Sequence, residues 1–354
     1  MANDPRDLDG YKLKQAMLRL GRDENLRRDL IAFLKKAEAQ LADEGDVRSE
    51  ITGPIVDALH DEKDAYEKTL SDGTRFHFLF RTKIARDFLM TDQEHPSHVW
   101  EPQTTKLLLK LTEGLKGDVI VGGAYFGDHA ILIAKKLQTQ KVHCFEPNQD
   151  QLSMLIENAK INLLNNVVAN PLGLWSESSV KLKLDGFDSF ANAILAKSNE
   201  DGFQTVTIDD YCAKKHSKIG LIQLDIEGAE LNALLGAKNV LQKDHPHIVF
   251  EVHKHYVNWD KGLENTEICR YLLDCGYKIY AIRDINSHKE MGDKLIELIP
   301  LGSIYLDGPP HGFNMLAIYD DGILNKLDFR VVQNVSPKLL PHKDAALHHP
   351  FDGF

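Results

Sequence analysis

Hydrophobic residues recur at two different spacings along the chain, and the change between them divides it into two parts. Before residue 70 the apolar residues follow helical spacing, as in NLRRDLIAFLKKAEAQLADEG, which ends at Gly45. A Ser-Asp-Gly turn signal then precedes RFHFLF (75–80), which alternates as a strand does. Residues 1–95 are therefore predicted to form an N-terminal extension of helices and a hairpin.

From about residue 100 onward, short apolar runs typical of buried strands alternate with amphipathic helices. The predicted strands lie at 118–123, 141–147, 167–175, 219–228, 247–253, 277–284 and 314–320. The predicted helices lie at 129–137, 151–164, 229–241 and 267–276. This alternation indicates an α/β, Rossmann-like domain over 96–325 with a mostly parallel seven-stranded sheet, followed by a C-terminal tail over 326–354.

Composition narrows the classes of function. The 354-residue chain carries a net charge of −11, which argues against nucleic acid as the partner because phosphate binding needs a basic face. No apolar run approaches the roughly 20 residues that cross a bilayer, and the N-terminus lacks a signal-peptide stretch. The four cysteines are spread out, as in reduced cytosolic proteins. We expect a cytoplasmic protein with a small-molecule partner; whether it forms a homodimer is left open.

A glycine-rich turn follows the first predicted strand. Glycines in such a turn let the backbone approach a ligand and open a helix N-terminus onto it. The next strand ends in Glu146, roughly 20 residues further on, where a carboxylate can accept hydrogen bonds from ribose hydroxyls. Gly123 and Gly127 form GxxxG rather than GxGxxG. That spacing favours S-adenosylmethionine over the dinucleotide of an NAD-dependent oxidoreductase.

Five segments in order resemble the FkbM-type methyltransferases. They are VGGAYFGDHA, FEPNQDQLSMLIENAKIN, TIDDYC, LIQLDIEGAELNALLGAKNVL and HIVFEVH, within residues 100–255. The resemblance implies a class I, S-adenosylmethionine-dependent enzyme of a mostly O-methylating family that acts on sugars and natural-product scaffolds. It also implies roles for five cofactor-binding residues: Gly123, Ala124 and Gly127 would lie under the methionine and ribose, Glu146 would bind the ribose, and Asn148 would lie near the adenosine.

One position departs from the family pattern. Val121 stands in the first strand where the family often has an aspartate, which is one possible anchor for the methionyl amine. Glu101, in VWEPQTTK just before that strand, is the candidate replacement. Asp209, in VTIDDY, matches the family's T-L-D segment.

Carboxylates at the ends of the fourth and fifth strands are the candidates for catalysis. Glu251 and His253 share one face of their strand, and Asp225 ends the neighbouring strand, so the three are predicted to converge at the ligand-binding edge. Asp225 is also expected to contact the cofactor. Methylation of an alcohol needs a general base or a metal ion. His253 as base is favoured over Mg²⁺ or Mn²⁺ held by Asp225, Glu251 and His253. Glu227 is interpreted as a helix cap and Glu230 as a helix-surface residue.

These observations predict an O-methyltransferase for a hydroxyl of a sugar, nucleotide-sugar, glycoside or other natural product. N-methylation of a small-molecule amine and a non-catalytic, methyltransferase-like binding protein stay open as alternatives. The N-terminal extension and an insertion over 285–313 are expected to shape the acceptor pocket, but neither carries a pattern that identifies the acceptor.

Overall fold

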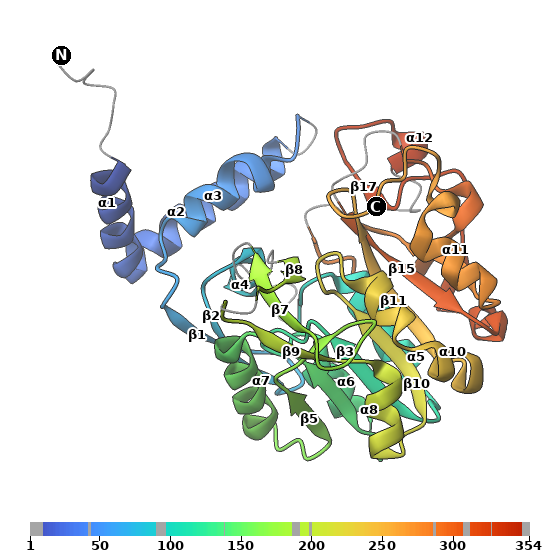
Figure 1. The fold of residues 1–354 in the computed structure, drawn as a ribbon. Coiled ribbons are helices and arrows are strands. Elements are labelled where there is room, and N and C mark those ends of the chain that lie inside the picture. Colours follow the sequence, from blue (N-terminus) through green and yellow to red (C-terminus); the bar gives the residue numbers. More distant parts are fainter. Residues whose placement is uncertain are drawn as a thin grey trace.

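Apolar strands of the second part of the chain pair into one nine-stranded sheet in the computed structural model (Figure 1). In spatial order the strands are β16 (Phe329–Val331), β14 (Ile296–Pro300), β12 (Lys278–Ile282), β15 (Gly312–Ile318), β11 (His247–His253), β10 (Ile219–Leu224), β3 (Asp118–Gly122), β4 (Val142–Phe145) and β5 (Val167–Asn170). The structure describes residues 10–41, 44–89, 97–137, 139–185, 192–197, 200–285, 288–306, 312–326 and 328–348.

The sheet is mixed but mostly parallel. Strands β11, β10, β3, β4 and β5 pair in parallel, and β15 lies antiparallel between β11 and β12. The predicted Rossmann-like class I methyltransferase fold is confirmed, but the sheet has nine strands instead of seven. The two additional strands are β14, inside the expected insertion, and β16, inside the expected tail. Residues 286, 287 and 307–311 of that insertion lie outside the described residues.

Alternating side chains of the strands enter two separate cores, one on each face of the sheet. On one face, Val119 and Val249 pack with α5 (Pro102–Leu111), α6 (Ala130–Lys136) and α7 (Gln149–Ile161). On the other face, Ile222 and Ile248 pack with four helices, which are α8 (Ile208–Lys215), α9 (Glu230–Leu235), α10 (Lys238–Asp244) and α11 (Glu267–Asp274). Both faces are covered, so the strands read as continuous apolar runs.

The N-terminal part contains helices and a hairpin, as predicted. Its elements are α1 (Gly10–Arg22), α2 (Glu24–Gln40), a π-helix (Arg48–Thr52), α3 (Gly53–Asp57), β1 (Ala65–Thr69), β2 (Arg75–Leu79) and α4 (Lys83–Leu89). Helices α1 and α2 extend away from the sheet (Figure 1). The hairpin is fixed to α7, because Asn158 Oδ1 accepts a hydrogen bond of 2.6 Å from the backbone N–H of His77. Within the described ranges, no helix has the length and apolar character needed to cross a membrane.

Several elements were not predicted. A small four-stranded sheet has the order β6 (Gly173–Leu174), β9 (Phe203–Val206), β7 (Lys181–Asp185), β8 (Asn192–Leu195). The C-terminal part adds β13 (Asp284–Ile285), which pairs with β17 (Lys338–Leu339), and α12 (Ala345–His348). Short 3-10 turns lie at Leu263–Asn265, Leu301–Ser303 and Asp321–Asn325. The single helix predicted over 229–241 is two helices, because α9 ends at its C-cap Gly236 and α10 begins at Lys238. A Cβ at Gly236 would lie 2.3 Å from the carbonyl oxygen of Trp175, so this close approach needs a glycine.

Candidate active site

A cavity lies at the carboxyl ends of β3, β4 and β10, which is the edge of an open α/β sheet where ligands bind. The loops after these three strands form one wall, and side chains of the small sheet form another. The lining includes Val121, Gly122, Gly123, Ala124, Tyr125, His129, Glu146, Asn148, Gln151, Leu174, Leu182, Phe203, Gln223, Asp225 and Glu227.

The glycine turn is shaped by close contact with the loop after β10. Gly123 has a φ of +72°, and a Cβ there would lie 1.7 Å from the carbonyl oxygen of Asp225, so only glycine fits. The N–H groups of Gly123 and Ala124 both donate to the carbonyl of Phe145, at 3.0 and 3.1 Å. Gly127 has a different role: its φ is +94°, and a Cβ would meet the side chain of Leu155 at 2.6 Å. Gly123 and Ala124 line the cavity, whereas Gly127 packs against α7 behind it.

Glu146 lies at the end of β4 and is held in place by the backbone around it. One carboxylate oxygen accepts a hydrogen bond of 2.9 Å from the N–H of Tyr125, and the other accepts one of 2.8 Å from the N–H of Asn148. The side chain is buried but lines the cavity. Asn148 also lines it, while its own side chain caps α7 by accepting from the N–H groups of Asp150 and Gln151. This capping role was not predicted from the sequence.

Two polar atoms in the cavity wall need a partner that the fold does not supply. Gln223 Oε1 and His129 Nε2 are buried and form no hydrogen bond with any described residue. Buried polar groups are nearly always hydrogen-bonded, so a polar ligand is expected beside them. Together with the left-handed Gly123 and the carboxylate of Glu146, these atoms make the cavity a suitable cradle for the S-adenosylmethionine implied by the resemblance.

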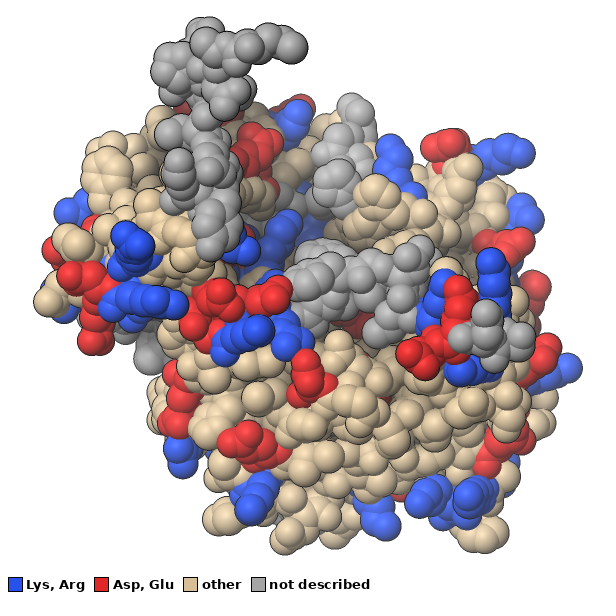
Figure 2. Space-filling model, turned by 60° about the vertical axis from the view of Figure 1, so that its left-hand side comes forward, with Lys and Arg blue, Asp and Glu red and all other residues tan. Residues whose placement is uncertain are grey.

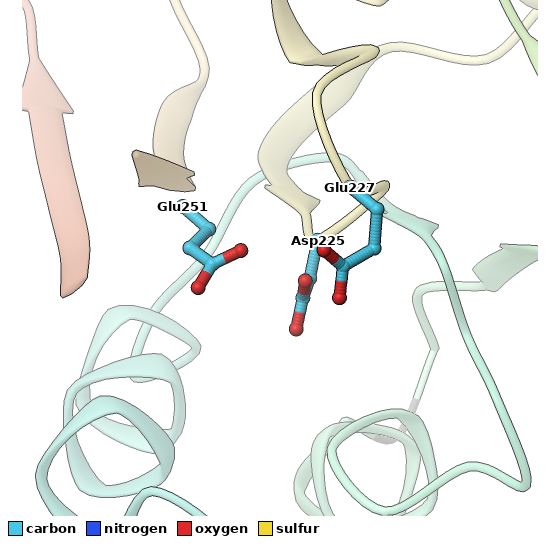
Figure 3. A group of neighbouring side chains, drawn as sticks. All are labelled: Asp225, Glu227 and Glu251. Carbon is cyan, nitrogen blue, oxygen red and sulfur yellow. The ribbon is translucent and has the colours of Figure 1, made fainter. Parts of the chain in front are cut away.

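Three carboxyl groups meet where the loop after β10 approaches the end of β11. Oxygen atoms of Asp225, Glu227 and Glu251 lie within 4.8 Å of one another (Figure 3). The predicted meeting of Asp225 with Glu251 is confirmed, but His253 is not in the group. His253 lies two residues further along β11, so its Cα is about 6–7 Å from that of Glu251 at the rise of a strand. Its ring stacks on that of His255. Glu227 takes the third place, because its left-handed backbone, with a φ of +51°, turns its side chain back toward Asp225.

The crowding of these carboxyl groups changes their acidity. The pKa of Asp225 is raised well above its usual value, first by burial and then by the charges of Glu251 and Glu227. Burial and the charge of Glu227 likewise raise the pKa of Glu251. Burial and then Glu230 raise the pKa of Glu227 to about 7, although a hydrogen bond with Tyr256 lowers it. Near neutral pH the group can therefore exchange protons, or it can hold a divalent cation through its oxygen atoms.

Neither Glu227 nor Glu230 caps α9: its N-cap residue is Ala229, which forms no side-chain cap hydrogen bond, so the interpretation of Glu227 as the cap is wrong. Glu230 is buried, and its carboxylate accepts hydrogen bonds from the N–H groups of Ile226, at 2.9 Å, and Gly228, at 3.1 Å. The interpretation of Glu230 as a surface residue is thus wrong. Its burial also raises its pKa to about 7.

Glu101 and Asp209 lie outside the cavity lining, as Glu251 does. Glu101 is buried at the start of α5 and accepts a hydrogen bond of 2.6 Å from Asn314 Nδ2. It lies near the carboxyl groups, since its charge raises the pKa of Asp225 and Glu251, but it does not line the cavity beside Gly123. The side chain of Asp209 accepts from the N–H groups of Asn239 and Val240 at the start of α10, so it orders a helix.

The chain is similar at low identity to solved structures that include two methyltransferases. An FkbM methyltransferase from Methylobacillus flagellatus KT is 17% identical with a TM-score of 0.40, over 67% of this chain and 53% of that one. The tRNA (uracil-54, C5)-methyltransferase of Pyrococcus abyssi, in complex with S-adenosyl-L-homocysteine, is 16% identical with a TM-score of 0.35, over 72% of this chain and 44% of that one. The match therefore spans about half the length of these two proteins.

No curated protein sequence matches the chain. A family model does match it, over the part of the chain that builds the cavity. Residues 122–279 match the family model described as the methyltransferase FkbM domain. This range begins at the glycine turn and contains Glu146, Asp225, Glu227 and Glu251. Residues 122–279 are therefore similar to the methyltransferase FkbM domain.

Proposed function

We propose that this protein is a cytoplasmic O-methyltransferase that methylates a hydroxyl group of a sugar or of a glycosylated natural product. The observation that carries the proposal is the meeting of Asp225, Glu227 and Glu251 directly beside the Gly123 turn. Carboxyl groups with raised pKa values are suited to accept a proton near neutral pH. An alcohol needs such a proton acceptor in order to be methylated. An amine, which would be the methyl acceptor in the alternative of N-methylation, needs a general base much less.

The residues of this chain can perform three tasks in the reaction. When bound, S-adenosylmethionine supplies an electrophilic methyl group. Gly123 and Glu146 orient the donor against the cavity wall, and positioning of this kind lowers a large part of the barrier. Asp225 or Glu227 then takes the proton from the acceptor hydroxyl as the oxygen attacks. Leu174, Leu182 and Phe203 of the small sheet line the opposite wall and restrict access of water.

A metal-assisted version uses the same three side chains. Asp225, Glu227 and Glu251 offer the oxygen ligands that Mg²⁺ or Mn²⁺ prefers, and a bound ion would lower the pKa of the acceptor hydroxyl itself. We favour the metal-free version, because the family resemblance does not require a metal and the sequence contains no compact ligand motif.

Mass spectrometry of products tests the function. The protein is incubated with S-adenosylmethionine labelled in its methyl group and with separate panels of nucleotide-sugars, glycosides, amines and tRNA. We expect the label on an oxygen of a sugar-containing acceptor, and none with Asp225→Asn. Methylation only of an amine, a protein or a nucleic acid would contradict the proposal.

The rate of methyl transfer is expected to rise with pH through the region near 7. A carboxyl group accepts a proton only in its deprotonated form, so turnover is low below the pKa of Glu227, about 7, and reaches a plateau above it. The measurement is kcat/KM of the wild type from about pH 5.5 to 8.5. A shift of the inflection to lower pH in Glu230→Gln would agree with the charge coupling between these residues. A profile that is flat in the wild type would contradict it.

A further inference from the structure

A largely buried lysine outside the cofactor cavity lies near Glu251. Lys338, in β17, is 4% exposed, and among the described residues its ammonium group has no hydrogen bond and no ion pair. Its charge acts on Glu251 and Asp284, but neither carboxyl group is within contact distance. The side chain is largely buried while the ammonium nitrogen itself keeps some access to solvent, so an anion or polar ligand can reach it.

Other buried polar atoms around Lys338 lack partners too. Asp284 is aligned with Lys338 on the neighbouring strand β13; one of its oxygens accepts from its neighbour Ile285 at 2.8 Å, while Oδ2 has no partner among the described residues. Oε1 of Gln103, a residue that is 1% exposed, and Nδ1 of His288 likewise have no hydrogen-bond partner among the described residues. The His288 ring stacks on Trp100 at 3.9 Å and 26°, which gives this group a flat aromatic wall.

The charges that face His288 are positive. Lys338, Lys83 and His98 all lower the pKa of its imidazole, after the larger effect of burial. Figure 2 shows a hollow beside the N-terminal helices with Lys and Arg side chains inside it. A positive region of this kind stands out in a chain with a net charge of −11.

We propose that Lys338, His288, Asp284 and Gln103 form the acceptor subsite, and that this subsite selects an acceptor with an anionic group, either a phosphate or a carboxylate. The proposal rests on the proposed function. Lys338 binds the anionic oxygen atoms, while Asp284 and Gln103 accept hydrogen bonds from sugar hydroxyls. Because Lys338 lies near Glu251, an acceptor held here extends its reacting hydroxyl toward the carboxyl groups of Glu251 and Asp225.

Calorimetric titration tests the subsite with three probes: glucose 1-phosphate, glucuronic acid and the neutral methyl glucoside, each with S-adenosylhomocysteine present. We expect at least one anionic probe to bind about tenfold or more tightly than the neutral one, and Lys338→Met to remove that difference. Lys83→Met, at an exposed position, should weaken binding of the anionic probe by a smaller factor than Lys338→Met does. Lys243→Met, on the exposed side of α10, is the matched control and should leave binding unchanged.

The outcomes separate this proposal from the function on which it rests. Equal binding of neutral and anionic probes, no binding of either anionic probe, or wild-type affinity in both Lys338→Met and Lys83→Met overturns the subsite. If Lys338→Met is unfolded by its thermal melting curve, the probe preference of the wild type and the effect of Lys83→Met decide. Selective anion binding without methyl transfer to any sugar supports the subsite and contradicts the O-methyltransferase assignment. Sugar methylation with an unchanged KM in Lys338→Met supports the O-methyltransferase assignment and contradicts the subsite.

Discussion

Asp225→Asn is expected to lower turnover by about 10²- to 10⁴-fold, the usual contribution of a general base, while S-adenosylmethionine still binds. The asparagine keeps the shape of the side chain, and the backbone contact with Gly123 is unaffected because it uses the carbonyl oxygen. The loss therefore concerns proton transfer or metal binding. The measurements are kcat with the identified acceptor and donor affinity by calorimetry.

Three further experiments show whether a carboxyl group, a histidine or a metal ion is responsible for the loss of turnover. Asp260→Asn, at an exposed position after β11, is the matched control and should keep wild-type turnover. His253→Ala should keep most activity if a carboxyl group is the base, and lose it if the histidine is. A chelator should leave activity intact in the metal-free version; if it stops turnover and Mg²⁺ or Mn²⁺ restores it, the carboxyl groups hold an ion. Near-normal turnover of Asp225→Asn would exclude both versions.

Glu146→Ala is expected to weaken binding of S-adenosylmethionine by about 1–3 kcal/mol, the range for lost hydrogen bonds to a charged group. We infer that the carboxylate accepts hydrogen bonds from the ribose, since it lines the cavity at the end of β4. The substitution also removes the acceptor for the N–H groups of Tyr125 and Asn148, so the turn around the donor loses its support. Calorimetry measures the affinity, and thermal melting shows whether the fold is intact.

A carboxylate elsewhere on the neighbouring helix provides the control for that experiment. Glu157 is exposed on α7 and pairs with His77, away from the cavity lining. Glu157→Ala should bind S-adenosylmethionine as the wild type does. If Glu146→Ala binds it equally well, Glu146 has only a structural role in the turn.

The central sheet could be predicted because its strands are buried on both faces and therefore form continuous apolar runs between amphipathic helices. The strand β16 at the edge of the sheet and its neighbour β14 were not predicted, since β16 has only three residues and neither is followed by an amphipathic helix of the repeating pattern. The small sheet β6–β9 was missed for a related reason. Its strands are short and pair across separated segments, and such pairing depends on tertiary contacts that local spacing does not reveal.

The candidate site was predictable where a residue's position along a strand fixes its place. Asp225 and Glu251 follow from the ends of adjacent parallel strands, and Glu146 from the end of the second. Glu227 was not predictable as their partner, because its approach depends on a left-handed backbone at a residue other than glycine. Lys338 lies within residues 326–354, which the sequence predicts to be a C-terminal tail. Only the pairing of β17 with β13 brings it near the site.

The contact between Gly123 and Asp225 makes the donor loop and the proposed base a single rigid unit. The N–H of Asp225 also donates to the carbonyl of Gly122 at 3.1 Å, so the two loops are joined from both sides. A redesign of this protein for a new acceptor would therefore leave that unit unchanged. Changes around Trp100, His288 and Lys338 could alter which molecule is accepted while the distance between methyl donor and proton acceptor stays constant.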